Sequence, residues 1–283
     1  MELIEHHLAE LSNSTVHYVT AGEGTPLVLL HGWPQTWYCW RRVIPLLASK
    51  YRIIAPDLPG LGESVSKSGR FDKRSIAAEI VELTSKHLEL DGYHLVGHDW
   101  GGGVAWAVAA HYPGNAKTLT LVDIAIPGDG SPNISQGGAR WHHGFHNTDS
   151  LPEELITGRE DIYLGWFYRN YGASKDAINS AEMEEYLRSY RRASVLHAGF
   201  ELYRAVAQDV KENAARASVY RPPIPVLAIG GGESWGRGAQ VGESARRMAD
   251  DVTEEIIEGA GHWIPEEQPE ALANLIDRFC MRR

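Results

Sequence analysis

Positive charge is scarce in this sequence. Its 283 residues include 27 Lys and Arg against 37 Asp and Glu, which leaves a formal net charge of −10. A surface that binds nucleic acid or an anionic membrane needs a concentrated positive field, because both partners carry closely spaced phosphates. The charge balance therefore argues against both as partners.

Long hydrophobic runs and a basic leader are also missing. The longest apolar stretches, such as Val104 to Ala110, are far shorter than the roughly 18 to 20 residues that cross a bilayer. The first residues, Met1 to His7, are acidic and lack the basic start and apolar core of a secretory signal. We therefore expect no membrane span and a protein that stays in the cytoplasm.

Cysteine is nearly absent. Cys39 and Cys280 lie at opposite ends of the chain, and neither has the spacing of a metal ligand or a redox pair. Thiols of a cytoplasmic protein are normally kept reduced. We expect two free thiols, both mostly buried, and no metal site.

The sequence is rich in short apolar runs that end at glycine, proline or a polar residue, as fully buried parallel strands do. The runs are Leu27–Leu30, Arg52–Ala55, Tyr93–Val96, Lys117–Val122, Pro225–Ile229 and Thr253–Ile257. Helical stretches lie between them, roughly at residues 37–48, 74–89, 101–111, 239–249 and 266–280. This alternation predicts an α/β fold with a parallel sheet covered by helices on both faces.

The alternation is interrupted once, between the run that ends near Asp123 and the run that begins at Pro225. The intervening stretch is rich in aromatic and helix-forming residues and contains no strand-like run. A structureless loop of this length is uncommon in a compact domain, so a helical insertion is predicted instead. We expect a core domain made of residues 1–125 and 221–283, and a helical lid made of residues 126–220.

The most specific motif is Val96-Gly97-His98-Asp99-Trp100-Gly101, between a predicted strand and a predicted helix. Gly97 and Gly101 permit a tight turn that raises the central side chain above the sheet, as in a nucleophile elbow. The raised residue is Asp99, and an aspartate can attack a saturated carbon to form an ester. A helix cap is the simpler role for Asp99, but capping does not require a glycine on both sides.

A second segment reaches the same edge of the predicted sheet, where the strand at residues 27–30 runs into His31-Gly32-Trp33-Pro34. The backbone N–H groups of Trp33 and Trp100 are predicted to form an oxyanion hole. An indole near a strand end is often only part of the core, which is the simpler role for both tryptophans. His31 and His98 flank this region and are predicted to orient its loops.

A third segment follows the last predicted strand, where His262 stands on a glycine-rich loop and is the candidate general base. Such a base needs a carboxylate on its other ring nitrogen to hold its tautomer and orientation. Asp123 ends the strand after the elbow, Glu233 follows a later strand, and the topology alone permits either. Asp123 is favoured because the glycines before Glu233 predict a more flexible loop there.

With these motifs the sequence resembles the α/β-hydrolase-fold epoxide hydrolases over nearly its whole length. The matching segments are His31 to Pro34, Asp57-Leu58-Pro59-Gly60-Leu61-Gly62, Gly97 to Gly102, and Gly261-His262-Trp263 with Pro265. The resemblance implies an eight-stranded, mostly parallel sheet with a helical lid. It is greatest for the bacterial subgroup typified by the cystic fibrosis transmembrane conductance regulator inhibitory factor, whose triad acid follows the strand after the elbow, and this supports Asp123.

The resemblance also implies roles for lid residues. Tyr203 matches the tyrosine that donates a hydrogen bond to the epoxide oxygen, and His142 matches its partner, while the adjacent His143 leaves the register open by one. The implied cycle is attack of Asp99 on an epoxide carbon, followed by hydrolysis of the ester by water that His262 activates, which releases a vicinal diol. The implied partner is a small-molecule epoxide, no metal or organic cofactor is implied, and a homodimer is left open.

Two other hypotheses stay open. A haloalkane or haloacetate dehalogenase shares the fold and the nucleophilic aspartate. However, the haloacetate dehalogenases that resemble this chain follow that aspartate with arginines, where this chain has Trp100-Gly101-Gly102-Gly103. They also place a Trp beside a lid His, where this chain has His142-His143. The second alternative is a biosynthetic tailoring enzyme or ligand-binding protein that uses the same fold on a bulky natural-product epoxide.

Overall fold

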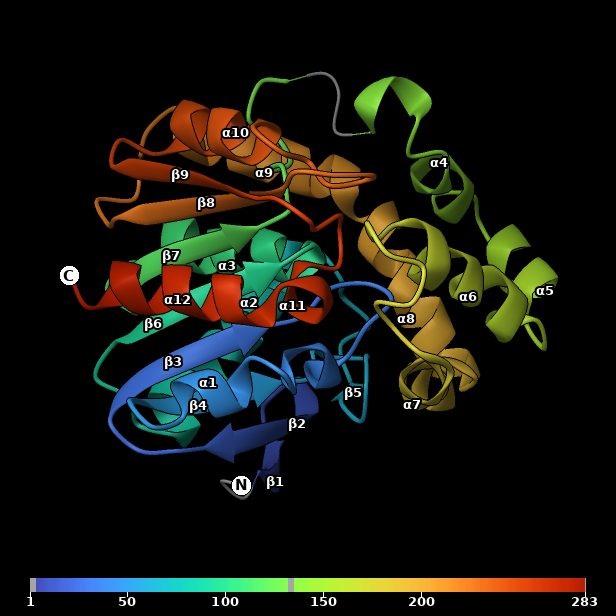
Figure 1. Cartoon of the computed structure of the whole chain (residues 1–283), viewed down its shortest axis with the longest axis horizontal. Helices are drawn as coiled ribbons and strands as arrows, with labels where there is room; N and C mark the ends of the chain where they lie inside the picture. Colours follow the sequence, from blue (N-terminus) through green and yellow to red (C-terminus); the bar gives the residue numbers. More distant parts are fainter. Residues whose placement is uncertain (1–3, 132–134, 283) are drawn as a thin grey trace.

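The computed structural model of the protein describes residues 4–131 and 135–282. In this part of the chain, nine strands form one sheet, with helices packed on both faces (Figure 1). Eight strands follow the order β1-β2-β4-β3-β6-β7-β8-β9, and the two-residue strand β5 pairs with β2. The bounds are β1 Glu5–Glu10, β2 Ser14–Ala21, β3 Thr25–Leu30, β4 Tyr51–Pro56, β5 Val65–Ser66, β6 Tyr93–His98, β7 Ala116–Val122, β8 Val226–Gly231 and β9 Val252–Ile257.

The strands from β4 to β9 along the sheet are mutually parallel, whereas β1 and β2 add an antiparallel edge. The six predicted runs fall on the parallel strands and their ends differ by at most two residues, so these predictions are confirmed. The sequence showed no apolar run for β1 or β2. Polar residues such as His6, Thr15 and His17 interrupt both strands. The edge strand β1 is largely exposed, so it does not need to be apolar on both faces, and the buried His17 of β2 bonds to Asp57 at 2.8 Å.

Helices cover the two faces of the sheet. In the view of Figure 1, α1 and α12 lie in front of the sheet, and α2 and α3 lie behind it. The helices of this core are η1 Trp37–Trp40, α1 Ile44–Leu47, α2 Lys73–Val81, the π-helix η2 Glu82–His87, α3 Trp100–His111, α10 Gln240–Met248, α11 Ile264–Glu267 and α12 Pro269–Cys280.

The predicted helices at residues 37–48 and 266–280 are not continuous, and the second breaks at Gln268, between α11 and α12. Residues 37–48 form the short 3-10 helix η1 and then α1, with a turn between them. Pro45 explains the interruption, because proline has no N–H to donate and its ring collides with the carbonyl group four residues earlier. Proline is tolerated in the first turn of a helix, and Pro45 occupies that position in α1.

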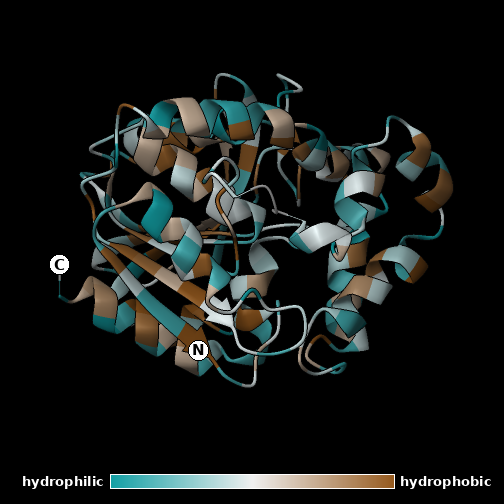
Figure 2. Cartoon of the chain, turned by 90° about the horizontal axis from the view of Figure 1, so that it is seen from above, coloured by the Kyte–Doolittle hydropathy of each residue, from teal (hydrophilic) through white to brown (hydrophobic). Residues whose placement is uncertain are grey.

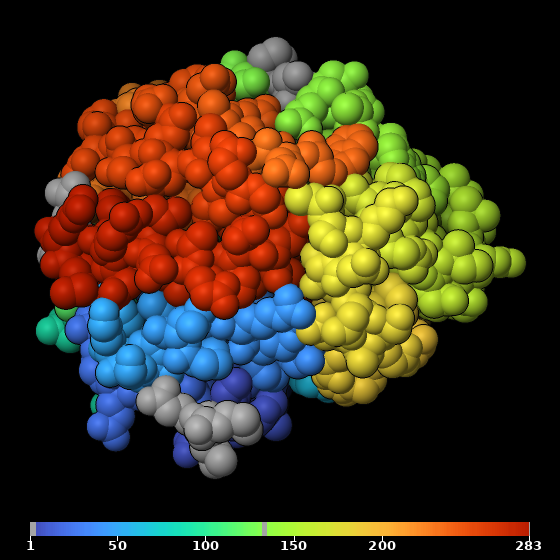
Figure 3. All heavy atoms as spheres, viewed as in Figure 1, coloured from blue at the N-terminus to red at the C-terminus, as the bar shows by residue number. Residues whose placement is uncertain are grey.

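Among the described residues, six α-helices and one short 3-10 helix lie between β7 and β8 in the chain. Most of them gather beside the sheet at the end where β3 and β7 finish (Figure 1), and they form the rounded mass of yellow and green atoms in Figure 3. The predicted helical insertion is present, while its limits at residues 126 and 220 stay a prediction. The helices are α4 His142–His146, α5 Leu151–Ile156, α6 Glu160–Asn170, α7 Ser180–Tyr190, α8 Ala193–Arg204 and α9 Val206–Ala217, preceded by η3 Gln136–Gly138.

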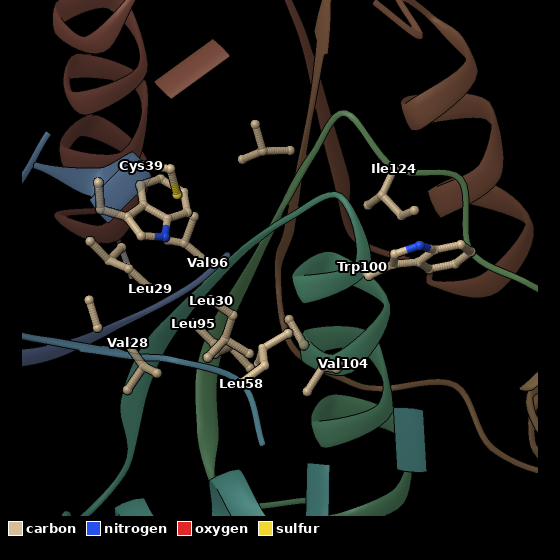
Figure 4. Packing of buried hydrophobic residues seen from close by; sticks show 14 of the residues in the cluster. Val28, Leu29, Leu30, Cys39, Leu58, Leu95, Val96, Trp100, Val104 and Ile124 are labelled. Atoms are coloured by element: carbon tan, nitrogen blue, oxygen red, sulfur yellow. The ribbon is translucent and has the colours of Figure 1, made fainter. Parts of the chain in front are cut away.

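The core lies between the sheet and its helices. Figure 2 shows hydrophobic strands enclosed by helices of mixed hydropathy, and Figure 4 shows Leu30 and Leu95 of the sheet close to Val104 of α3. All three side chains are fully buried. Each side chain of this kind stabilises the fold by about 1.5 to 3 kcal/mol on burial. Cys39 and Cys280 are free and buried, as expected from the sequence.

Within residues 4–131 and 135–282, no helix combines the length and the apolar composition that a membrane crossing requires. The same part of the chain contains no group of three or more His, Cys, Asp or Glu side chains arranged to hold a metal ion.

Candidate active site

Asp99 stands at the sharp turn between β6 and α3. Its φ of 50° lies in the left-handed region, where a non-glycine residue is strained. Neighbouring glycines make the turn possible: a Cβ on Gly97 would lie 2.3 Å from the carbonyl oxygen of Gly101, and a Cβ on Gly32 would lie 2.4 Å from the Cβ of Asp99. The turn therefore holds the Asp99 side chain beside the loop that follows β3.

Backbone N–H groups from two loops meet at the Asp99 carboxylate. The N–H of Trp33 donates to Asp99 Oδ1 at 2.9 Å. The N–H of Trp100, at the start of α3, is a second donor to the carboxylate. The structure thus brings together the two donors that the sequence predicted, and donors preorganised in this way can stabilise an oxyanion.

His262 lies on the loop between β9 and α11 and connects two carboxylates. Its Nδ1 is 2.6 Å from Asp123 Oδ2, and its Nε2 is 3.5 Å from Asp99 Oδ2. The other oxygen of Asp123 accepts the backbone N–H groups of Gly231 at 3.1 Å and Arg237 at 2.7 Å. Asp123 therefore cannot rotate freely, and it holds the His262 ring with Nε2 toward Asp99.

Glu233, the other candidate for the acid, makes its contacts elsewhere. Its side chain is exposed and accepts the backbone N–H of Gly259 at 3.1 Å. Asp123 directly follows β7, whereas Glu233 lies two residues beyond the end of β8. The structure therefore places Asp123, and not Glu233, at His262.

In this group, pairing of opposite charges affects the pKa values more than burial does. Burial raises the pKa of Asp99, but the hydrogen bond and the charge of His262 hold the pKa well below its usual range. The pKa of Asp123 is lowered in the same way against its burial. Burial lowers the pKa of His262, and the hydrogen bonds that it donates to Asp123 and Asp99 reverse this effect and raise the pKa above 6.5. Asp99 is therefore an ionised carboxylate near neutral pH.

This pairing predicts that the pKa of His262 depends on the charge of Asp99. The Asp99→Asn substitution removes one of the two negative charges facing His262, so the raised pKa of His262 should fall and the imidazole should lose its proton at a lower pH than in the wild type. An NMR titration of the His262 ring in both proteins measures the difference. Asp277→Asn, on α12, serves as the control. Equal midpoints for the wild type and Asp99→Asn would contradict the pairing.

Two side chains of the inserted helices lie over this group. The ring of Tyr203, on α8, meets the rings of Trp33 and Trp100 edge-on, with centroids 5.5 Å and 5.2 Å apart. The ring of His142, at the start of α4, is 5.5 Å from that of Tyr203, and its Nδ1 is 3.0 Å from the hydroxyl of Tyr171. Burial raises the pKa of Tyr203 and lowers the pKa of His142, so both are uncharged near neutral pH.

The other predicted histidines occupy different positions. His31 is fully buried, and its Nε2 accepts the backbone N–H of Leu58 at 3.0 Å. His98 donates from Nε2 to the carbonyl oxygen of His262 at 2.8 Å, and burial lowers the pKa of His98 to about 4. Both histidines therefore fix the backbone of a loop by a hydrogen bond, His31 at Leu58 and His98 at His262. The ring of His143 lies 5.3 Å from that of Tyr203, so both histidines of the His142-His143 pair reach the site.

The sequence did not predict that Lys73, at the start of α2, is buried. Its neighbours Asp72 and Arg74 are charged and predict an exposed position. Lys73 is 1% exposed, and its Nζ lies 2.9 Å from Asp209 Oδ2 on α9. The same ammonium group is 4.2 Å from the centroid of the Trp100 ring and donates to the carbonyl oxygen of Leu202. Lys73 therefore connects the core to the residue before Tyr203.

His146 and Tyr171 were also missed. The Nε2 of His146 is 2.6 Å from the hydroxyl of Tyr163, and its ring is 4.4 Å from that of Tyr203. Tyr171 stacks on Trp235 with ring centroids 4.8 Å apart. The four-residue step from His142 to His146 puts both on one helix face, which is a signal that the sequence did contain.

A cavity of about 300 Å³ adjoins this group. Its wall includes Ser135, His143, Asn147, Tyr203, Val206 and Ala207. Tyr203 belongs both to this wall and to the group around Asp99, so the cavity and the group are neighbours.

Comparisons with known proteins agree with this geometry. The α/β hydrolase fold family matches residues 25–269. A soluble epoxide hydrolase of Corynebacterium sp. (strain C12) is 36% identical over 284 residues, covering 98% of this chain and 97% of the relative. A fluoroacetate dehalogenase of Burkholderia sp. is 32% identical over 213 residues, which is 72% of this chain and 70% of the relative.

A solved structure has the same fold. The crystal structure of Cfl2 from Burkholderia cenocepacia superimposes with a TM-score of 0.91 at 37% identity, covering 98% of this chain and 95% of Cfl2. The fold class predicted from the sequence and the resemblance to the epoxide hydrolases are both confirmed. The chain belongs to the α/β-hydrolase fold family, and within it to the relatives of the soluble epoxide hydrolases.

Proposed function

We propose that the protein is an epoxide hydrolase that converts an epoxide to a vicinal diol through an ester on Asp99. The observation that supports this most is the position of one carboxylate. Asp99 stands at a strained elbow between the N–H of Trp33 at 2.9 Å and the Nε2 of His262 at 3.5 Å. A carboxylate held in this way can attack a saturated carbon, and the ester that forms lies within reach of a base.

The first step opens the ring. One oxygen of Asp99 forms a bond to an epoxide carbon, and the bond between that carbon and the ring oxygen breaks. Tyr203 gives its proton to the released oxygen, and His142 is the second donor to it. The hydroxyl of Tyr171 bonds to Nδ1 of His142, which leaves Nε2 of that ring to carry the proton that faces the substrate.

The second step hydrolyses the ester. Ester formation removes the negative charge of Asp99, so His262 loses its proton more readily and can accept one from water. The hydroxide attacks the Asp99 carbonyl carbon while the Trp33 and Trp100 N–H groups hold the oxyanion. The bond between this carbon and the diol oxygen breaks, and His262 protonates that oxygen. The regenerated Asp99 releases a proton to solvent, Tyr203 recovers its proton from there, and His262 takes back from solvent the proton that it lost after ester formation.

An oxygen-isotope experiment tests this route. When excess enzyme converts styrene oxide once in ¹⁸O-labelled water, the heavy oxygen should enter the Asp99 carboxylate and the diol of that turnover should stay unlabelled. Mass spectrometry of the diol and of the peptide that contains Asp99 measures both. Asp99→Asn is the blank. Heavy oxygen in the first diol, with an unlabelled Asp99, would exclude the ester route.

Dehalogenation is the second candidate, because the similarity to the fluoroacetate dehalogenase covers most of the chain. It would use the same Asp99, with a halide in place of the epoxide oxygen as the leaving group. The resembling haloacetate dehalogenases follow the nucleophilic aspartate with arginines, whereas Trp100-Gly101-Gly102-Gly103 follows Asp99 in this chain. Halide release from haloacetates and haloalkanes, compared with diol formation from small, aromatic and bulky epoxides, separates the two reactions and addresses the hypothesis of a bulky natural-product substrate.

A further inference from the structure

Two arginines are buried beside the proposed reaction site. Arg140, two residues before α4, is 2% exposed, and Arg237, in the loop after β8, is 6% exposed. Arg140 donates from Nε to Oε1 of Gln136 at 2.9 Å and from Nη2 to the carbonyl oxygen of Trp235 at 2.7 Å. Arg237 donates from Nη1 to Oε1 of Gln240 at 3.0 Å, and Gln136 Nε2 donates to the same oxygen at 3.1 Å. Neutral amides therefore link the two guanidinium groups.

The two positive charges lie close enough to affect each other and their surroundings. Burial and the charge of Arg140 lower the pKa of Arg237 to about 9. Burial and the charges of both arginines lower the pKa of His143, which lines the cavity, to about 3. Burying like charges together is unfavourable unless an anion comes close to them.

The charges of the arginines act both on His143 in the cavity wall and on the carboxylates of the reacting group. The backbone N–H of Arg237 donates to Asp123 at 2.7 Å, and the guanidinium carbon of Arg140 is 5.7 Å from the ring centroid of Tyr171. Arg140 also lies two residues from His142. An anion held by both guanidinium groups would therefore lie near His143 of the cavity wall and near Asp99.

The formal charges of this buried group do not cancel. Asp99 and Asp123 bring two negative charges, whereas His262, Arg140 and Arg237 bring three positive charges. The excess grows when Asp99 becomes an ester, because a negative charge is then lost. A carboxylate on the substrate would balance the group before ring opening, and it would balance the ester state once His262 has lost its proton.

We propose that Arg140 and Arg237 form a carboxylate-binding subsite and that the preferred substrates are epoxides that carry a carboxylate. The proposal rests on the epoxide hydrolase function. Guanidinium groups suit this ligand because their planar N–H donors match the two oxygens of a carboxylate. The carboxylate fixes the substrate at one end, so that the epoxide carbon meets Asp99 and the apolar remainder occupies the cavity.

A matched pair of substrates tests the subsite. The anion 3-phenylglycidate and its neutral amide, 3-phenylglycidamide, have nearly the same shape, and kcat/KM should be about 10- to 100-fold higher for the acid, as expected for a charge-assisted hydrogen bond. Arg140→Gln and Arg237→Gln should each lower the value for the acid by about this factor and change the value for the amide by less than about threefold. Arg278→Gln, an exposed position on α12, is the matched control and should change neither.

Binding gives a readout that needs no turnover. Calorimetry should show that cinnamate binds more tightly than cinnamamide, and that Arg140→Gln removes the difference while Arg140→Lys retains part of it. Equal binding of the two compounds, or parallel losses for acid and amide in the arginine variants, would overturn the subsite.

The subsite and the proposed function can fail separately. Diol formation from styrene oxide without any preference for acids overturns the subsite and keeps the epoxide hydrolase. Arg140-dependent cinnamate binding, without diol from any epoxide, keeps the subsite and overturns the hydrolase. Arg140-dependent halide release from fluoroacetate, in the absence of diol formation, would also keep the subsite and assign it to a dehalogenase.

Discussion

Replacing His262 by Gln is expected to lower steady-state diol formation by about 10²- to 10⁴-fold, the usual contribution of a general base, while the ester on Asp99 still forms. The reason is that His262 acts on water only after Asp99 has attacked. The Nε2 of His262 lies 3.5 Å from Asp99 Oδ2, and its Nδ1 is held by Asp123 at 2.6 Å. Mass spectrometry of His262→Gln incubated with styrene oxide should show the protein mass increased by one substrate.

Three variants complete this experiment. Asp99→Asn should form no adduct. Asp123→Asn should slow hydrolysis and accumulate the ester as well, because it removes the carboxylate that orients His262. Glu233→Gln is the matched control and should keep normal turnover, since Glu233 contacts Gly259 instead. Equal losses in Glu233→Gln and Asp123→Asn would contradict the proposed triad, and an unmodified His262→Gln protein after incubation with diverse epoxides would contradict the ester.

Replacing Lys73 by Met is expected to lower the free energy of unfolding by about 3 to 5 kcal/mol, because removal of one partner leaves a buried charge uncompensated. Lys73 and Asp209 are 1% and 3% exposed, and Nζ lies 2.9 Å from Oδ2. Burial already raises the pKa of Asp209, and the charge of Lys73 opposes that effect. Urea unfolding of both proteins measures the loss.

A double variant and a surface pair give the controls for Lys73. Lys73→Met combined with Asp209→Leu should recover much of the loss, because neither buried charge then remains. Lys50→Met removes a pair with Asp277 at 2.6 Å, but the Lys50 side chain is 54% exposed, so a change of about 0 to 1 kcal/mol is expected. A loss no larger than that of Lys50→Met, or a double variant less stable than the single one, would contradict the role of the buried pair.

The sheet and the elbow could be predicted because their signals are local. The apolar run Leu27–Leu30 predicts a central, buried strand. Gly97 and Gly101, on either side of Asp99, predict a tight turn that only small neighbouring residues permit. Pro45 carried an equally local signal, and it contradicts the continuous helix expected for residues 37–48.

The sequence by itself determined the α/β fold, the elbow at Asp99 and a histidine beyond the last strand, because hydrophobic periodicity and glycine spacing act over a few residues. Tertiary structure alone decided which carboxylate meets His262, why Lys73 is buried, and that Arg140 and Arg237 lie near one another. These outcomes depend on residues far apart in the chain, Lys73 with Asp209 for example. Only the packing of the inserted helices against the sheet sets such distances, and no local pattern encodes them.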